Sequence, residues 1–352
     1  MKKISSINQI INDARKGKMF ILVDNKDREN EGDLVIPASK VNPKKINFMA
    51  KHGRGLICLA LTSQKVKKLN LPLMSLVNKS RTQTAFTVSI ESKKGISTGI
   101  SAHDRAKTIK VAIKPSSTKK DIVSPGHVFP LVAKRGGVLE RAGHTEASVD
   151  ISKLARLNPS AVICEVMNED GTMARYKDLV PFAKTHKLKI AKIEDLISYR
   201  LKNEKFIKNI SNKIINIKKF GKFDLKVFIN KLDSSEHYAI TKGKFFKNRP
   251  VRVRVISTNI LKNITNFKKK TFKNSLKHLI KFNNFALIVV KGNSAEPSSE
   301  ESNSRILRQY GVGAQIIKEL KIKNMILVSR SKKRIIALKG YGIKVVKQEI
   351  IK

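Results

Sequence analysis

Several kinds of residue are scarce in this chain, and each scarcity excludes a class of protein. Cysteine occurs only as Cys58 and Cys164, so the sequence contains neither a disulfide framework nor a Cys-x-x-Cys zinc pair. Tryptophan is absent and aromatic residues amount to 6%, which argues against the base-stacking surface of a single-strand nucleic-acid binder. Since no uninterrupted apolar run reaches about eighteen residues, we expect no membrane-spanning helix.

The N-terminus lacks a feature of exported proteins. Residues 1–6, Met-Lys-Lys-Ile-Ser-Ser, do not contain the long apolar core of a signal peptide. Both cysteines lie in apolar, strand-like runs, where we expect reduced thiols. These features predict a cytoplasmic protein with no membrane partner.

Acidic residues are also scarce, since 27 of them stand against 73 lysines and arginines, which gives a formal net charge of +46. Residues 201–352 are especially basic, with 36 basic and 9 acidic residues. Such an excess ordinarily suggests a nucleic-acid partner. Because the charge is dispersed as lysine among isoleucine and asparagine, we regard nucleic-acid binding by this basic part as the less favoured alternative.

One short segment departs from this basic background. Residues 24–33 follow the apolar run 19–23, which predicts a buried strand with the acidic residues on the loop at its end. The carboxylates of this segment are Asp24, Asp27, Glu29, Glu31 and Asp33. Clustered carboxylate oxygens suit Mg²⁺, which usually takes one or two protein carboxylates and completes its shell with water and substrate oxygens. The alternative interpretation is a solvated charged turn bent at Gly32.

Four further residues are candidates for chemistry. His144 lies in a glycine-containing loop, where a neutral imidazole can bind a metal, and Arg141 three residues earlier can bind a phosphate. His127 follows a Pro-Gly turn and Glu165 lies in an apolar strand, so both are candidates for general acid–base catalysis. Each also has a structural alternative, because a histidine in a turn is often structural and a strand glutamate often pairs with a basic residue.

The pattern of expected elements indicates an α+β protein whose first domain is an α/β sandwich. Helical spacing is found at 4–16, 43–52 and 104–113, and strand patterns at 19–23, 55–61, 85–90 and 161–166. The length allows two domains, and we expect the first over 1–200, a helical connector over 201–206, and a smaller α+β domain over 207–352. In the last, we expect strands near 223–229, 251–255, 325–328 and 343–346, a loop at 293–304 and a helix containing Ile316.

Four motifs in the first 200 residues carry a resemblance to a known family. They are Asp-Arg-Glu-Asn-Glu-Gly-Asp at 27–33, Ser-Pro-Gly-His at 124–127, Arg-Ala-Gly-His-Thr-Glu-Ala at 141–147 and Cys-Glu-Val-Met at 164–167. In this order they resemble 3,4-dihydroxy-2-butanone 4-phosphate synthase of riboflavin biosynthesis. The resemblance implies conversion of ribulose 5-phosphate to 3,4-dihydroxy-2-butanone 4-phosphate and formate. It also implies a homodimer and Mg²⁺ or Mn²⁺, with two ions per site.

The resemblance further implies a role for each matching residue. Glu29 and His144 would bind the metal, and His127 and Glu165 would be needed for the proton transfers. Arg141 and Thr145 would bind the substrate phosphate. The substrate-binding residues that the resemblance implies are Arg28, Glu29, Glu31, Asp33, Arg141, Ala142, Gly143, His144, Thr145 and Glu165, with Cys58 lining the pocket.

The second domain resembles the C-terminal part of GTP cyclohydrolase II over residues 305–347, and especially over 308–316. That enzyme holds zinc through three cysteines and uses a catalytic arginine with an aspartate as base. Here Arg308 is retained, Ile306 stands where the aspartate is expected, and no cysteine occurs between 201 and 352. We therefore expect no zinc and no cyclohydrolase activity. The alternative is a bifunctional enzyme that uses other metal ligands, for which His237 and His278 are the histidines available.

Overall fold

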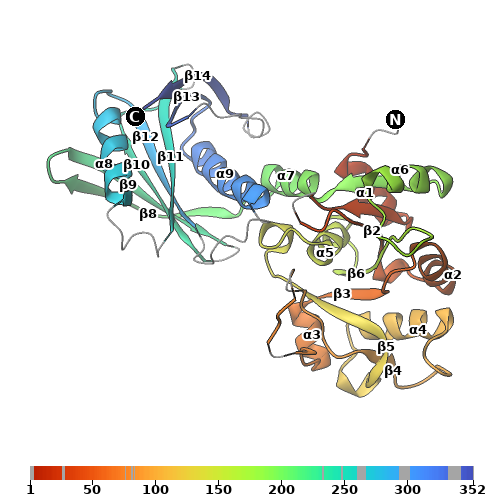
Figure 1. Ribbon diagram of the computed structural model, residues 1–352. Helices are drawn as coiled ribbons and strands as arrows, with labels where there is room; N and C mark the ends of the chain where they lie inside the picture. Colours follow the sequence, from red (N-terminus) through yellow and green to blue (C-terminus); the bar gives the residue numbers. More distant parts are fainter. Residues whose placement is uncertain are drawn as a thin grey trace. The chain divides into compact units, whose positions relative to one another are not determined.

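The computed structural model divides the chain into two compact units, Met1–Ile197 and Ser198–Lys352, each described by itself (Figure 1). The structure describes residues 4–25, 28–75, 77–80, 82, 84–231, 234–246, 249–259, 267–292, 302–331 and 342–351. Both units contain helices and strands, which confirms the predicted α+β class. Among the described residues, no helix is long and apolar enough to cross a membrane.

The first unit is built on a mixed sheet of seven strands. In chain order these are β1 (Phe20–Val23), β2 (Gly32–Pro37), β3 (Cys58–Thr62), β4 (Ile90–Ser92), β5 (Ile122–Ala133), β6 (Ser160–Glu165) and β7 (Lys189–Lys192). Their order in the sheet is β4-β5-β3-β6-β2-β1-β7. The antiparallel pairing of β2 with β6 sets Asp33 opposite Glu165, and that of β3 with β6 sets Cys58 opposite Ile163. The ends of these central strands therefore bring three segments of the sequence together.

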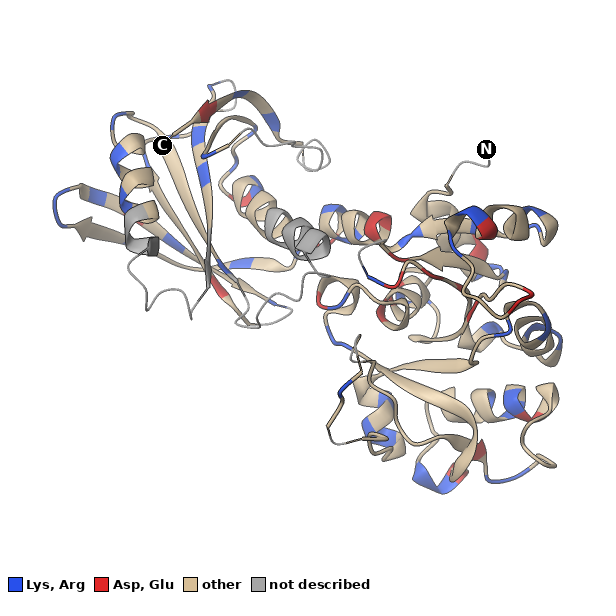
Figure 2. Ribbon diagram, viewed as in Figure 1, with Lys and Arg blue, Asp and Glu red and all other residues tan. Residues whose placement is uncertain are grey.

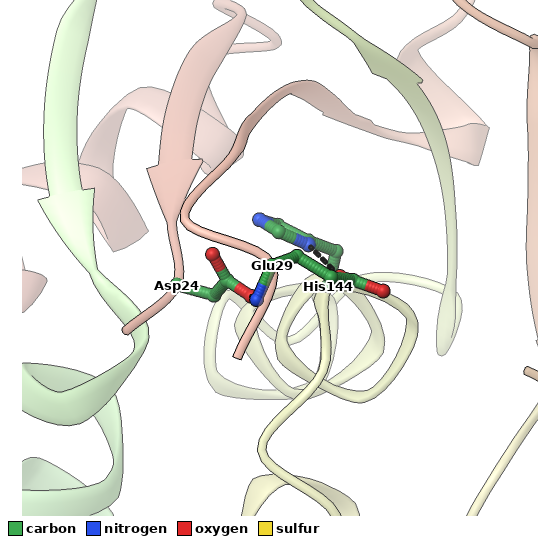
Figure 3. Close-up of side chains that lie close together, drawn as sticks. All are labelled: Asp24, Glu29 and His144. Carbon is green, nitrogen blue, oxygen red and sulfur yellow. Dashed lines mark hydrogen bonds and ion pairs between the residues drawn. The ribbon is translucent and has the colours of Figure 1, made fainter. Parts of the chain in front are cut away.

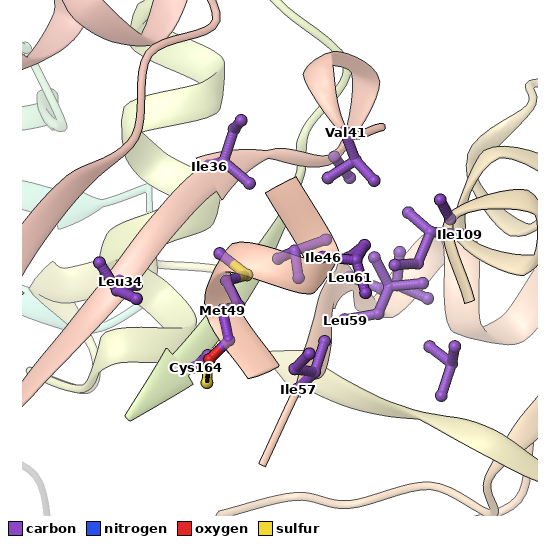
Figure 4. Packing of buried hydrophobic residues seen from close by; sticks show 14 of the residues in the cluster. Leu34, Ile36, Val41, Ile46, Met49, Ile57, Leu59, Leu61, Ile109 and Cys164 are labelled. Atoms are coloured by element: carbon purple, nitrogen blue, oxygen red, sulfur yellow. Dashed lines mark hydrogen bonds between the residues drawn. The ribbon is translucent and has the colours of Figure 1, made fainter. Parts of the chain in front are cut away.

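Helices cover both faces of this sheet. Its helices are α1 (Ile7–Arg15), α2 (Pro43–Phe48), α3 (Ser63–Leu69), α4 (Ala102–Ile113), α5 (His144–Leu154), α6 (Tyr176–Thr185) and α7 (Ile193–Asn203), of which α7 continues into the second unit. On one face, Leu59 and Leu61 pack with Ile46 and Ile109 from α2 and α4 (Figure 4). On the other face, Ala60 packs against Val149 of α5. Alternate residues of β3 thus serve two separate cores, as the period of a strand requires.

Local sequence explains where the helices begin. Ser6 and Gln9 form a capping box at the start of α1, in which each side chain binds the backbone N–H of the other residue. Asn42 caps α2, whose first residue is Pro43. A π-helical turn, Met49–Gly53, continues α2 and carries the chain towards β3.

One predicted strand of the first unit is wrong. Residues 85–90 alternate in polarity, but Phe86 and Thr87 make only isolated bridges, to Leu131 and Leu73, and the regular strand β4 begins at Ile90. The segment is hydrogen-bonded to β5 on one side and to residues 72–74 on the other, but each side forms a single bridge, so no regular strand extends over 85–90. The predicted helical connector over 201–206 is helical only up to Asn203, where α7 ends, and β8 begins at Ile207.

The second unit contains another seven-stranded sheet, of order β14-β13-β11-β12-β10-β9-β8. Its strands are β8 (Ile207–Ile217), β9 (Gly221–Asn230), β10 (Glu236–Lys242), β11 (Val251–Asn259), β12 (Phe285–Gly292), β13 (Asn324–Ser329) and β14 (Lys344–Ile350). Helix α8 (Phe267–Leu279) packs Leu276 and Leu279 on one face, beside Phe285. Helix α9 (Ser302–Glu319) brings Gly313 against Val255. The predicted loop 293–304 lies largely outside the described residues.

Strand β8 lies at the edge of the second sheet, where β9 is its one partner strand in the described part of the chain. Two of its isoleucines are exposed, Ile210 by 47% and Ile214 by 75%. Lys208 and Lys213 are exposed on the same strand. Lysine and arginine are spread in this way over strands and helices of both units (Figure 2).

Candidate active site

Asp24 organises the acidic loop between β1 and β2. It follows the last residue of β1 and is 7% exposed. Its carboxylate accepts the backbone N–H of Glu29 at 3.0 Å and that of Glu31 at 2.9 Å. Arg28 donates to the same carboxylate at 3.0 Å and also contacts Glu29. The loop is therefore folded back on Asp24, which fixes the Glu29 side chain.

Glu29 and His144 meet beside Asp24 (Figure 3). His144 is the first residue of α5 and not a loop residue as predicted, because Gly143 already serves as the N-cap. Its Nδ1 atom lies 3.7 Å from Glu29 Oε2, and its Nε2 atom lies 3.8 Å from Asp33 Oδ1. One ligand atom from each of Asp24, Glu29 and His144 falls within 4.8 Å of the others. These three residues form a compact cluster of possible metal ligands.

Burial and charge together shift the pKa values in this cluster. Burial raises the pKa of Asp33, and the neighbouring carboxylate of Glu165 raises it further, while His144 opposes the change. Burial also lowers the pKa of His144, but Asp33 and Glu29 outweigh it and raise that pKa to about 9. For Glu29, burial raises the pKa, whereas hydrogen bonding to His144 and the charge of Arg28 lower it to about 2. The imidazole is thus strongly coupled to the surrounding carboxylates.

Glu165 is the last residue of β6 and is half-buried, so it is less enclosed than its place in an apolar run predicted. Its Oε2 atom accepts the backbone N–H of Leu56 at 2.9 Å. A Cβ atom on Gly55 would lie 2.6 Å from that carboxylate, so a glycine is required at this close approach. Cys58 begins β3 just beyond, and burial raises the pKa of its thiol well above the ordinary range.

His127 lies within β5, where we had expected a position after a turn. Its Nδ1 atom is in contact with a carboxylate oxygen of Glu91 on β4. Strand β5 is separated from β2 by β3 and β6, so in this chain His127 stands apart from the cluster around Glu29. Since its side chain is 45% exposed, the imidazole is accessible while the carboxylate fixes its orientation.

Arg141 is held by neighbours on both ends of its guanidinium. Nη1 donates to Glu146 Oε2 at 2.7 Å, and Nη2 donates to the Thr82 carbonyl at 3.0 Å and to Thr84 Oγ1 at 2.9 Å. Thr82 also lies near Glu29, and its side chain helps to lower the pKa of that carboxyl. The segment that contains Thr82 and Thr84 therefore connects Arg141 with the carboxylate cluster.

A family model for 3,4-dihydroxy-2-butanone 4-phosphate synthase matches residues 8–199, which is more than half of the chain. The chain belongs to this family. A second model, for GTP cyclohydrolase II, matches residues 208–290 and 290–349.

Relatives of this synthase family match the chain over nearly its whole length. A riboflavin biosynthesis protein RibBA of Aquifex aeolicus is 42% identical, with 99% of this chain and 93% of the relative covered. A 3,4-dihydroxy-2-butanone 4-phosphate synthase of Photobacterium phosphoreum is 43% identical, with 97% and 98% covered. Each of these relatives thus matches both units of the chain.

Solved structures agree with this assignment. The crystal structure of RibBX, a two domain 3,4-dihydroxy-2-butanone 4-phosphate synthase from A. baumannii, is 40% identical, has a TM-score of 0.85 and covers 99% of each chain. A structure of a synthase of this family in complex with two magnesium ions is 38% identical, with a TM-score of 0.55, and covers 57% of this chain and 98% of that one. The fold of the synthase family is therefore present in full.

The residues of this chain fit a divalent cation at the synthase site. Carboxylates of Asp24 and Glu29 and the imidazole of His144 offer oxygen and nitrogen ligands on one side of the acidic loop. Among the described residues, His144 Nε2 and Asp33 Oδ1 are buried without a hydrogen-bond partner. Buried polar atoms are normally satisfied, so these two favour a ligand between the loop and α5.

Several residues of the site were missed by the sequence interpretation, although the structure places them beside predicted ones. Asp24 belongs to the predicted acidic segment. Its position directly after a predicted strand could have indicated that it is part of the site. Arg175, whose Nη1 atom donates to the Glu29 carbonyl at 2.6 Å, and Glu91 carry no local signal. Glu146 lies within the motif 141–147 without an assigned role. Each of the four orients another residue.

Proposed function

We propose that the first unit converts D-ribulose 5-phosphate to 3,4-dihydroxy-2-butanone 4-phosphate and formate in riboflavin biosynthesis. The observation that carries this proposal is the cluster of Asp24, Glu29 and His144, whose ligand atoms lie within 4.8 Å of one another. Arg141 stands three residues before His144 and is linked to Glu29 through Thr82. A metal site next to a fixed arginine suits a sugar phosphate.

The cation we propose is Mg²⁺, with two ions per site and Mn²⁺ as a substitute. Bound there, the metal supplies Lewis acidity and a template for the substrate oxygens. Glu29 and His144 are its direct ligands, and Asp24 keeps Glu29 in place through the backbone of the loop. The magnesium complex of a relative that is 38% identical supports the choice of ion.

The other roles follow the chemistry of the substrate. Arg28, Glu31 and Asp33 line the sugar, and Arg141 to Thr145 bind its phosphate, with Ala142 and Gly143 presenting backbone groups at the start of α5. Enolisation, loss of water and release of a carbon as formate need proton transfers at successive carbons. Glu165 makes these transfers together with His127, which stands apart from the cluster in one chain and would reach it from the second chain of the proposed homodimer. Cys58 lines the pocket. The fixed orientation of His127 and Glu165, by Glu91 and by Leu56 N–H, supports this assignment.

The second unit has no GTP cyclohydrolase activity in this proposal. No cysteine occurs after Cys164, so the thiolates that would hold zinc are missing from the sequence. The side chains of Ile306 and Arg308 lie outside the described residues. Relatives named for one activity, such as the two domain synthase of A. baumannii, support this assignment.

The bifunctional alternative would need His237 or His278 as a metal ligand. His237 Nδ1 accepts the backbone N–H of Lys291 at 3.1 Å, and its Nε2 atom lies 3.2 Å from Ser235 Oγ. His278 Nε2 lies 3.5 Å from a carboxylate oxygen of Glu349. His237 is therefore engaged in hydrogen bonds, whereas His278 Nε2 is buried without a hydrogen-bond partner among the described residues. The inactive assignment rests on the missing thiolates.

The deciding experiment follows formate release by the purified chain. One sample contains Mg²⁺ and ribulose 5-phosphate, and the other contains Mg²⁺, Zn²⁺ and GTP. We expect formate only from the sugar phosphate, and its loss in Glu29→Ala and His144→Ala. Formate from GTP would refute the inactive second unit, and formate from neither substrate would refute the synthase.

Two assembly properties complete the proposal. The chain forms a homodimer, which light scattering of the purified protein tests directly. Nucleic acid is not its partner, so binding to RNA or DNA should be weak and should disappear on modest addition of salt. Tight binding at physiological ionic strength would instead support the basic second unit as a nucleic-acid module.

A further inference from the structure

Glu146 is a buried carboxylate in contact with Arg141, the arginine that we assign to the substrate phosphate. Glu146 lies in the first turn of α5 and is 1% exposed. Its Oε2 atom accepts Arg141 Nη1 at 2.7 Å, and its Oε1 atom accepts the backbone N–H of Lys134 at 3.1 Å. Both oxygens therefore have a donor, and the carboxylate is tied to the loop that precedes Arg141.

The glycine between these two residues is part of the same arrangement. A Cβ atom on Gly143 would lie 2.3 Å from Arg141 Nη1 and 2.9 Å from Glu146 Oε2. The arginine thus passes directly over the backbone at the start of α5 to reach the carboxylate. No larger residue fits there without displacing the ion pair, so the position of Arg141 depends on close packing as well as on charge.

The guanidinium is fixed on its other side too. Nη2 donates to the Thr82 carbonyl and to Thr84 Oγ1, so three of its five N–H groups have protein acceptors among the described residues. The side chain of Arg141 is 13% exposed. A long, flexible side chain is thereby held in one conformation, with donors left over for an anion.

We propose that Glu146 is a positioning residue that orients Arg141 for the phosphate group of the substrate. This inference rests on the proposed function, in which Arg141 binds that phosphate. Glu146 does not touch the substrate. It fixes the plane of the guanidinium, so that Arg141 loses less conformational entropy when phosphate binds. The Thr82 carbonyl and the Thr84 hydroxyl complete the support.

The test compares Glu146→Gln with Asp150→Asn as a matched control. Asp150 is also buried on α5, one turn further along, and accepts the backbone N–H of Val138 at 2.8 Å. Each change removes one buried charge that supports the loop before α5, but of these two residues it is Glu146 that forms the ion pair with Arg141. Unfolding temperature, kinetic constants and the dissociation constant for inorganic phosphate are measured for both.

We expect Glu146→Gln to raise KM and the phosphate dissociation constant by about tenfold, with kcat within about twofold of the parent, since a hydrogen bond to a charged group is lost. Asp150→Asn should lower the unfolding temperature and leave both quantities unchanged. Glu146→Asp, which keeps the charge, should recover part of the loss. In an Arg141→Ala background, Glu146→Gln should have no further effect on phosphate binding.

Two outcomes would overturn the assignment. One is an unchanged or tighter phosphate dissociation constant in folded Glu146→Gln, and the other is an equal effect with and without Arg141. If Glu146→Gln does not fold, the same comparison in Glu146→Asp decides. Calorimetry with phosphate alone needs no turnover, so a parent protein without synthase activity would refute the proposed function and still leave the role of Glu146 measurable.

Discussion

The backbone N–H of Leu56 donates to the Glu165 carboxylate at 2.9 Å, and the chain can approach so closely only because residue 55 is glycine. Replacing Gly55 by alanine places a Cβ atom 2.6 Å from the carboxylate oxygen. We expect Gly55→Ala to lower kcat by about 100-fold, because a catalytic group displaced by about 1 Å loses its productive geometry. The rate of formate release at saturating substrate gives kcat, and Glu165→Ala gives the rate expected when the carboxylate is lost altogether. Full activity of a folded variant would exclude Glu165 from the reaction.

The loop held by Asp24 leads to a prediction about metal affinity. In Asp24→Asn the backbone N–H groups of Glu29 and Glu31 lose a charged acceptor. The dissociation constant for Mg²⁺ should rise by about 10-fold to 100-fold, as is usual when a group supporting a metal ligand is removed. Isothermal titration calorimetry gives the value. Asp13→Asn is the control, since Asp13 binds Lys189 at 3.0 Å elsewhere in the unit, and an equal loss there would contradict the prediction.

The contact between Glu91 and His127 predicts that loss of the Glu91 carboxylate slows turnover and leaves substrate binding unchanged. Glu91→Gln should lower kcat by about 10-fold to 100-fold and leave KM nearly unchanged, because the carboxylate orients an imidazole that transfers protons. Glu169→Gln removes an exposed carboxylate that pairs with Arg54 and should have no effect. Equal kinetics of Glu91→Gln and the parent enzyme would mean that the contact is structural.

The raised pKa of His144 predicts how metal binding depends on pH. The imidazole must lose its proton to bind a metal, and in the metal-free cluster its pKa is raised from 6.5 to about 9 by the surrounding carboxylates. Mg²⁺ affinity should therefore increase from pH 6.5 to pH 9, by at most about tenfold per pH unit for one released proton, and level off above. Titrations at fixed ionic strength measure it. An affinity independent of pH over this range would show that His144 is not a ligand.

How much of the site could be predicted depended on how its residues are distributed in sequence. Glu29 and His144 belong to short contiguous motifs, so residue type and order sufficed to propose them, and the structure places them within reach of one another. Glu91 and His127 are brought together by the pairing of β4 with β5, a contact that no local pattern records. Their pairing could be found only from the structure.

The same distinction holds for the fold. Long apolar runs such as Phe20–Val23 formed the expected buried strand. The alternating segment 85–90 did not, because its pattern describes burial on one side and carries no information about a partner strand. His144 was expected in a loop for a related reason, since Gly143 caps α5 without a side-chain hydrogen bond that the sequence could have indicated.

The exposed edge strand β8 gives the high lysine content a physical role. This strand of eleven residues carries Ile210 and Ile214 at its surface, and on its outer side no described strand pairs with it. Such an edge is a template for another chain in an extended conformation. Lys208 and Lys213 on that strand make the approach of a second copy electrostatically unfavourable. We therefore expect part of the positive charge of this protein to oppose aggregation through this edge.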